Sequence, residues 1–130
     1  MKKQAFNPYL PSYEYIPDGE PYVFNGRVYI YGSHDHYGSP VFCLNDYVSW
    51  SAPIDNLGDW RYEGVSFKKT DDPANIDGRA VLYAPDLTVG PDGKYYLYYC
   101  LDKFPFVSVS VSEEPQWPYN LYGYVHYQDW

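Results

Sequence analysis

Residues 15–35, YIPDGEPYVFNGRVYIYGSHD, contain the pattern that decides the fold. An acidic Pro-Asp-Gly-Glu-Pro cluster leads into two short apolar runs, 21–24 and 28–32, which are joined by Asn25-Gly26. Asn-Gly between two such runs is the strongest short-range signal for a β-hairpin. The stretch therefore predicts a hairpin with carboxylates at the mouth of its first strand.

A second stretch, residues 83–99 (YAPDLTVGPDGKYYLYY), repeats this design. Asp86 follows a proline and precedes a short apolar run, a turn that contains Gly90 and Gly93, and a tyrosine-rich run. Glycine and proline between two such runs are typical of a hairpin turn. Asp18 in the first stretch and Asp86 in the second are therefore predicted to open two equivalent hairpins.

The segments that follow the two hairpins also recur, about 60 residues apart. Val48–Ser51 resembles Val109–Ser112, and Tyr62–Val65 resembles Tyr122–Val125. No interval keeps the apolar periodicity of an amphipathic helix. The sequence therefore predicts an all-β protein of two repeated units, with short strands at 21–24, 28–32, 41–43, 47–52, 60–67, 80–83, 86–89, 95–100, 106–112 and 121–126.

Four-stranded antiparallel units in tandem are typical of β-propeller blades, whose innermost strands border a central channel. We expect residues 1–130 to form a single partial propeller domain with about two blades. The proline-rich residues 1–17 would be an extended segment, followed by one blade at about 18–67 and another at about 80–126. A two-sheet β-sandwich is the alternative architecture.

The composition limits the partners that the protein can have. The chain has 130 residues, of which 45% are hydrophobic, which is enough for one domain with a core. Its formal net charge of −8 argues against nucleic acid and anionic membranes as partners, because both require basic patches. No apolar run is long enough for a membrane span, and residues 1–8 lack the apolar core of a signal peptide. The sequence thus indicates a cytoplasmic protein or, alternatively, the mature form of a secreted or periplasmic one.

Cysteine and histidine give no metal-binding pattern. Cys43 and Cys100 stand singly in apolar runs, which is typical of buried free thiols. His34 and His36 flank Asp35, but the glycines on either side of this group predict a loop rather than a ligand cluster. We expect no metal site in these residues.

Acidic residues at the mouths of equivalent propeller strands would point toward the same end of the channel. Two or three carboxylates in an aromatic pocket are typical of glycoside hydrolysis, in which one activates water and another protonates the leaving oxygen. The chain has 18 tyrosines, whose rings are suited both to sugar sites and to the filling of sheets. The alternative is that Asp18 only forms a turn with Gly19 and that Asp86 only caps a backbone amide.

Several motifs, in order and over nearly the whole chain, resemble the opening of a family 43 glycoside hydrolase. They are NPYLP at 7–11, IPDGEP at 16–21, YIYGSHD at 29–35, WS at 50–51, NLGDW at 56–60, LYAPD at 82–86 and GKYYLYY at 93–99. The resemblance implies a five-bladed propeller of the β-xylosidase, α-arabinofuranosidase and arabinanase type. It also implies inversion through an Asp base, an Asp that orients and tunes, and a Glu general acid.

The resemblance assigns roles to individual residues. Asp18 resembles the general base, and Asp86, in its Ala-Pro-Asp motif, resembles the pKa-tuning aspartate. Glu20, which directly precedes a proline, is the alternative base. Four further residues fall at substrate-lining positions, with ordinary packing as the alternative: His34, Asp35, Trp50 and Tyr83.

In the family that the chain resembles, the general acid belongs to a later blade, and Glu113-Glu114 does not resemble it. We therefore expect the N-terminal portion of a glycosidase that acts on xylo- or arabino-configured glycosides, with the general acid missing from residues 1–130. Its partner would be a plant-type xylan or arabinan oligosaccharide. No cofactor is identified, although the complete propeller could hold a structural calcium.

Two readings from other functional classes stay open. The chain could be a non-catalytic carbohydrate-binding module or a structural half-propeller. Because propellers close with at least four blades, two blades would leave apolar faces open, and we expect a chain that stands alone to self-associate. The sugar, its linkage and the exo or endo mode do not follow from the sequence.

Overall fold

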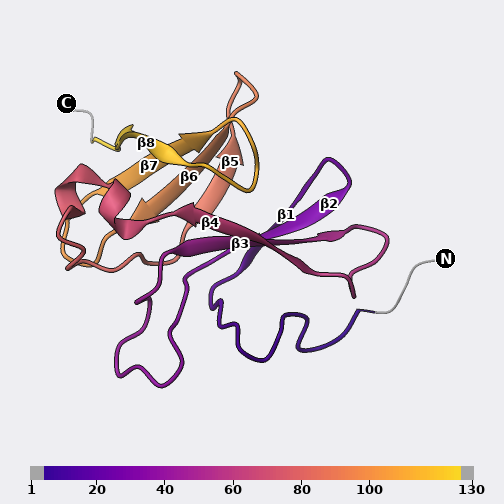
Figure 1. Cartoon of the computed structure of the whole chain (residues 1–130). Helices are drawn as coiled ribbons and strands as arrows, with labels where there is room; N and C mark the ends of the chain where they lie inside the picture. The colour runs from indigo at the N-terminus through magenta and orange to yellow at the C-terminus, as the bar shows by residue number, and fades with distance from the viewer. Residues whose placement is uncertain (1–4, 127–130) are drawn as a thin grey trace.

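The computed structural model describes residues 5–126, which form two four-stranded antiparallel sheets (Figure 1). The first sheet consists of β1 (Glu20–Phe24), β2 (Arg27–Tyr31), β3 (Tyr47–Pro53) and β4 (Arg61–Phe67). The second consists of β5 (Asp86–Val89), β6 (Tyr95–Cys100), β7 (Val107–Ser112) and β8 (Asn120–Tyr124). Two 3₁₀ turns, η1 (Lys69–Asp71) and η2 (Pro73–Asn75), connect the sheets. Residues 1–4 of the expected extended segment, like residues 127–130, lie outside the described part of the chain.

In each sheet the strands are neighbours in the order in which they occur along the chain. Each sheet is therefore an antiparallel meander, as in a propeller blade, whereas the Greek-key connections of most sandwiches place non-consecutive strands side by side. The structure confirms the expected all-β fold and its two four-stranded units.

The hairpin turns form where the sequence predicts them. Asn25 and Gly26 both have positive φ, 50° and 74°, and they join the paired residues Phe24 and Arg27. This is the backbone that a two-residue hairpin turn requires and that Asn-Gly adopts with little strain. In the second sheet the amide of Gly90 donates to the carbonyl of Lys94 at 2.8 Å and closes the turn between β5 and β6.

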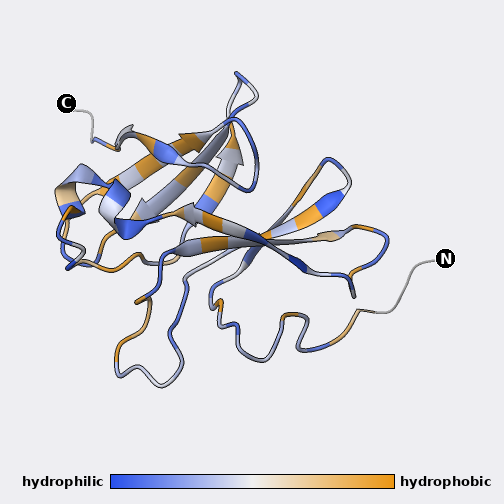
Figure 2. Cartoon of the chain, viewed as in Figure 1, coloured by the Kyte–Doolittle hydropathy of each residue, from blue (hydrophilic) through white to orange (hydrophobic). Residues whose placement is uncertain are grey.

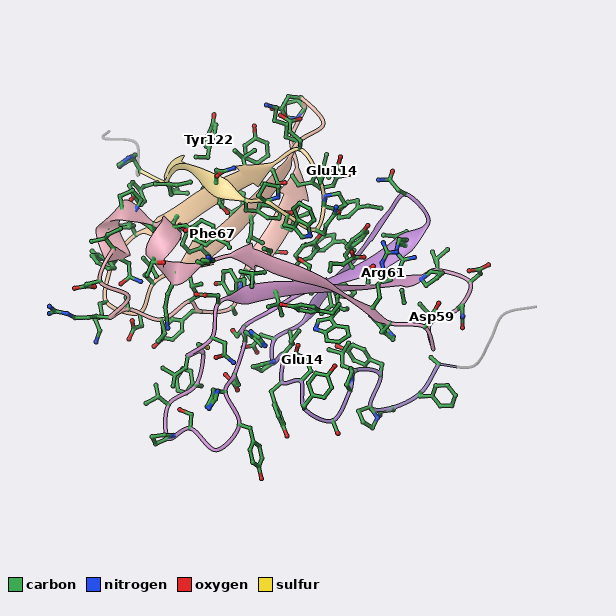
Figure 3. The ribbon with its side chains drawn as sticks, viewed as in Figure 1. Glu14, Asp59, Arg61, Phe67, Glu114 and Tyr122 are labelled. Atoms are coloured by element: carbon green, nitrogen blue, oxygen red, sulfur yellow. The ribbon has the colours of Figure 1, made fainter. Side chains whose placement is uncertain are left out.

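The core lies between the two sheets and is largely aromatic. Figure 2 shows apolar segments on the strands of both sheets and hydrophilic turns between them. Phe67 of β4 packs on Tyr99 of β6 with ring centroids 4.9 Å apart, and its side chain lies between the sheets in Figure 3. The buried cluster consists of Tyr29, Tyr31, Tyr47, Phe67, Ala80, Leu82, Leu87, Leu97, Tyr99, Leu101 and Tyr119. Both sheets contribute to it, so the two blades share one core.

A buried carboxylate fixes the connection between the sheets to the second blade. Asp72 is 0% exposed and precedes η2, where its Oδ1 accepts from the amide of Ala74 at 2.9 Å. Its oxygens also accept from three hydroxyls of the second sheet, those of Tyr99 at 2.7 Å, Ser108 at 3.2 Å and Tyr124 at 2.8 Å. These four donors satisfy a charge that would otherwise be costly to bury.

Two of the expected strands are wrong. Residues 41–43 form bends instead, and Cys43 has a φ of 60°, which no strand accommodates. Residues 80–83 contain only an isolated bridge between Leu82 and Leu101. In both segments side chains, rather than a neighbouring strand, accept hydrogen bonds from the backbone. Asp35 Oδ1 accepts from the Cys43 amide, and Asn75 Oδ1 accepts from the Ala80 amide. No helix in residues 5–126 has the length and apolar character needed to cross a membrane.

Candidate active site

Asp18 lies in the turn just before β1, where its carboxylate is exposed and its φ is 56°. The turn packs directly on Gly32, at the end of β2. A Cβ atom at residue 32 would lie 2.6 Å from Cγ2 of Ile16 and 2.8 Å from the carbonyl oxygen of Pro17. The absence of a side chain at Gly32 therefore allows the segment that carries Asp18 to approach the sheet.

Asp86 is the first residue of β5 and is also exposed. Its Oδ1 accepts a hydrogen bond from the Tyr22 hydroxyl and another from its neighbouring amide, that of Leu87, at 2.8 Å. Tyr22 belongs to β1, so the first strand of one blade contacts the first residue of the next. The hydrogen bond to Asp86, together with partial burial and the charges of Asp86 and Glu20, raises the pKa of Tyr22 to about 12.

The loop of residues 33–46 lies beside the turn that carries Asp18. Asp35 shapes this loop, since its Oδ1 accepts from the Cys43 amide at 2.7 Å and its carbonyl accepts from Asn45 Nδ2 at 3.0 Å. Burial raises the pKa of the Cys43 thiol, and the negative charge of Asp35 raises it further. Asp35 therefore lies beside the residue whose backbone amide it holds.

The same loop presents an aromatic surface. Phe42 is 62% exposed and stacks on the half-buried ring of Tyr83, with centroids 5.9 Å apart and an interplanar angle of 27°. The carbonyl of Tyr83 accepts from the buried hydroxyl of Tyr47, which fixes the backbone three residues before Asp86. The sequence points to Tyr83 but not to Phe42, because the segment that contains Phe42 resembles a buried strand.

His34 and Trp50 are held by Glu14, at the base of the N-terminal segment. His34 Nε2 lies 2.6 Å from Glu14 Oε1 and its Nδ1 lies 2.7 Å from the Asp46 carbonyl, while Trp50 Nε1 donates to Glu14 Oε2 at 2.7 Å. Figure 3 shows Glu14 beneath the first sheet. Trp50 is 3% exposed, so the structure places it in the core, with almost no surface for a ligand. Glu14 could not be singled out from the sequence because its partners lie 20 and 36 residues away.

The predicted site residues thus fall into two groups. Tyr83 and Asp86 are contacted from the first blade, and Asp18 and Asp35 lie in two adjoining segments of that blade, whereas His34 and Trp50 belong to the Glu14 network. Glu20, the alternative base, is the exposed first residue of β1, paired with Tyr31. No group of three or more His, Cys, Asp or Glu side chains in residues 5–126 is arranged to hold a metal ion.

Two consecutive meander blades, each with an exposed aspartate at or just before its first strand, define the chain as part of a β-propeller. No protein-family model matches the chain. It is 70% identical over 129 residues to a xylosidase/arabinosidase of Thermoclostridium stercorarium, which covers 99% of this chain and 27% of that protein. It is 35% identical over 117 residues to xylosidase/arabinosidase 43A of Humicola insolens, with 82% of this chain and 35% of the relative covered.

A solved structure of the same kind of enzyme also resembles the chain. The chain superposes with a TM-score of 0.67 and 32% identity on a GH43 β-xylosidase/α-arabinofuranosidase from a compost microbial metagenome, determined with xylotriose in a calcium-free form. That alignment covers 85% of this chain and 35% of the solved one. The chain is thus a portion of a family 43 glycoside hydrolase, and it spans about a quarter to a third of the length of these relatives.

Proposed function

We propose that the chain contributes part of the active site of a glycosidase that hydrolyses xylo- or arabino-configured glycosides with inversion. The observation that carries this proposal is the position of Asp18 and Asp86, two exposed carboxylates on adjacent blades, whose first strands are joined by the bond from Tyr22 to Asp86. The names of the relatives support the class of substrate.

In the proposed mechanism Asp18 is the general base, which removes a proton from water as the water attacks the anomeric carbon. A carboxylic acid on the other side of the glycosidic bond protonates the leaving oxygen, and an inverting enzyme keeps the two groups about 6.5–9.5 Å apart to admit the water. This acid would come from outside the 130 residues. Asp86 would orient the acid and influence its protonation through its charge.

The surface formed by Phe42 and Tyr83 is the proposed contact for the sugar. Stacked, partly exposed rings provide apolar area with little loss of side-chain entropy, which suits the C–H face of a pyranose or furanose. Asp35, which shapes the loop that carries Phe42, would position this surface rather than bind the sugar by itself. The xylotriose complex of the structural relative is in keeping with such a surface.

The proposal is tested in the longer protein that contains this chain. Asp18→Asn should lower kcat on aryl xylosides and arabinofuranosides by roughly 10²–10⁴-fold with little change in sugar binding, and Glu20→Gln should have a smaller effect. Proton NMR of the first-formed sugar anomer distinguishes inversion from retention. A larger loss at Glu20 would transfer the role of base to that residue, and retention of anomeric configuration would overturn the mechanism.

Residues 1–130 alone should bind sugar weakly and show almost no turnover, because proton donation to the leaving group is expected to come from elsewhere. A purified 130-residue chain with robust turnover would contradict this expectation. Measurable binding of xylotriose, without turnover even in the longer protein, would instead favour the carbohydrate-binding alternative.

A further inference from the structure

We infer that Tyr22 is a positioning residue for Asp86: a phenol on the first strand of one blade fixes the orientation of the carboxylate that opens the next blade. The inference concerns a residue that carries no motif in the sequence. It rests on the proposed function of Asp86 and adds to it the group that holds this carboxylate in place.

The geometry provides one firmly held oxygen. Oδ1 of Asp86 accepts from the Tyr22 hydroxyl and from the Leu87 amide, while no donor within residues 5–126 reaches Oδ2. Two donors on the same oxygen fix the plane of the carboxylate, because rotation about the bond to Cβ would break both. Oδ2 is then available to a ligand or to another group of the site.

The ring of Tyr22 is itself held by its neighbours. It lies parallel to Phe24, with centroids 6.0 Å apart at 3°, and tilted against Tyr31 at 6.1 Å. Tyr31 is anchored in turn, since its hydroxyl donates to the Pro115 carbonyl at 2.7 Å. The phenol therefore reaches Asp86 from a fixed aromatic stack rather than from a freely rotating side chain.

The chemistry of the pair suits this role. A phenol with a pKa of about 12 is protonated at any pH at which a glycosidase works, so Tyr22 acts only as a donor. Hydrogen bonds to a charged acceptor are roughly twice as strong as neutral ones. A hydrogen bond across the boundary between the blades would keep Asp86 in one orientation when substrate enters.

The hydrogen bond can be tested in the 130-residue chain without any activity. With [¹³Cζ]tyrosine labelling, the Tyr22 signal is assigned by its loss in Tyr22→Phe. At pH 11 it should have moved less than halfway to the phenolate position, whereas in Asp86→Asn it should move more than halfway, because an ordinary tyrosine titrates near pH 10. The Tyr22 hydroxyl proton, followed at pH 6, should be protected from exchange in the wild type and lose that protection in Asp86→Ala, which removes the acceptor oxygen. This second reading does not depend on alkaline stability.

The role in the site is tested in the longer protein with a double-mutant cycle. Tyr22→Phe keeps the aromatic stack and removes only the donor, so kcat should fall about 10-fold while KM changes little. In the Asp86→Asn background the same change should alter kcat less than about 2-fold, because Tyr22 acts through Asp86. Tyr96→Phe is the matched control, since the Tyr96 hydroxyl donates to Asp92 at 2.8 Å in an exposed turn, and its kcat should equal that of the wild type.

The outcomes separate the inference from the proposed function. An unprotected Tyr22 hydroxyl, an ordinary titration near pH 10 in a chain that is still folded at that pH, or an equal loss of kcat in both backgrounds overturns the inference. A protected hydroxyl in a protein whose Asp86→Asn variant keeps full activity overturns the proposed role of Asp86 and leaves the hydrogen bond intact.

Discussion

At residue 32 the chain has no room for a side chain, because the turn that carries Asp18 lies against the backbone there. Gly32→Ala should displace this turn and lower the free energy of unfolding by about 1–3 kcal/mol, the usual cost of overpacking. Urea unfolding of the 130-residue chain measures the change. Gly123→Ala is the matched control, since a Cβ there meets no atom within 4 Å. Equal stability of the two variants would show that the turn can move away without cost.

Phe42 is the exposed member of the aromatic pair beside the candidate site. Phe42→Ala should raise KM for xylo-oligosaccharides in the longer protein by roughly 2–10-fold, the loss expected for one aromatic contact, with no change in melting temperature. The control is Tyr122→Ala on β8, a ring that is 67% exposed and points away from the first sheet in Figure 3. An unchanged KM in Phe42→Ala, or an equal effect in the control, would remove Phe42 from the proposed sugar surface.

At the scale of elements, Asp72 connects the 3₁₀ turns to three strands of the second sheet. Asp72→Ala would leave the amide of Ala74 and three hydroxyls without their acceptor, and an unsatisfied buried polar group costs about 1–3 kcal/mol. We expect a loss of at least about 3 kcal/mol in the free energy of unfolding, measured in urea.

Asp92→Ala provides the comparison for Asp72. Asp92 also accepts from a tyrosine hydroxyl, that of Tyr96, but in an exposed turn where water can replace the lost oxygen. Its free energy of unfolding should change by less than about 1 kcal/mol. Similar losses in the two alanine variants would mean that the connection between the sheets reorganises and supplies other partners.

The elements that the sequence predicted are those with local signals. Asn25-Gly26 and the glycines after β5 determine hairpins from a few adjacent residues, so both turns form where expected. The segment at 41–43 resembles a strand in its apolar residues, yet Asp35 holds the Cys43 amide from eight residues away, which no local pattern reveals. The 3₁₀ turn η2 is likewise held by Asp72, whose other partners lie 27 to 52 residues away in the second sheet.

The candidate site shows the same division between local and distant contacts. Asp18 and Asp86 could be selected because both stand in a proline-flanked motif, and the resemblance to a known family gave them roles. Tyr22 and Glu14 could not, because their partners are brought to them only by the packing of one blade on the next and of the N-terminal segment on β3. Trp50 resembles a ligand-lining residue in sequence, but its strand places the ring in the core.

At the scale of the whole molecule, a core rich in buried tyrosines makes the free energy of unfolding decrease at alkaline pH. Burial is the main cause that raises the pKa of the Tyr31, Tyr47, Tyr99 and Tyr119 phenols in the folded chain. In the unfolded chain these phenols titrate near pH 10. Their contribution to stability is therefore fully present below about pH 10 and is lost as the pH rises further, when the unfolded state releases protons that the folded state keeps.

Urea midpoints between pH 7 and pH 11 measure this dependence. We expect a nearly constant midpoint up to about pH 9.5 and a steep decline above it. Absorbance at 295 nm should show the buried phenols ionising together with unfolding rather than before it. A gradual ionisation of all tyrosines in a chain that stays folded would contradict the assignment of these four rings to the core.

Two blades alone leave sheet faces without a neighbour, and several exposed apolar side chains of the second blade lie there, among them Tyr98, Val107 and Tyr122. Contiguous exposed apolar patches above a few hundred Å² are rare in soluble monomers. We predict that the 130-residue chain self-associates, as a symmetric dimer, when it is studied alone. Light scattering over a dilution series decides this, and the mass of a single chain at high micromolar concentration would contradict it.

The consecutive order of strands in each sheet has a consequence for biosynthesis. Every strand pairs with the one made just before or just after it, so the first sheet is complete once the ribosome has released residues up to the end of β4. Its pairings close only loops within one blade, the longest of them residues 32–46, and such local contacts favour rapid formation. The face that carries Tyr29, Tyr31 and Phe67 is then ready before β5 emerges. The second blade can thus fold against a preformed aromatic template during translation, in the direction in which the chain is made.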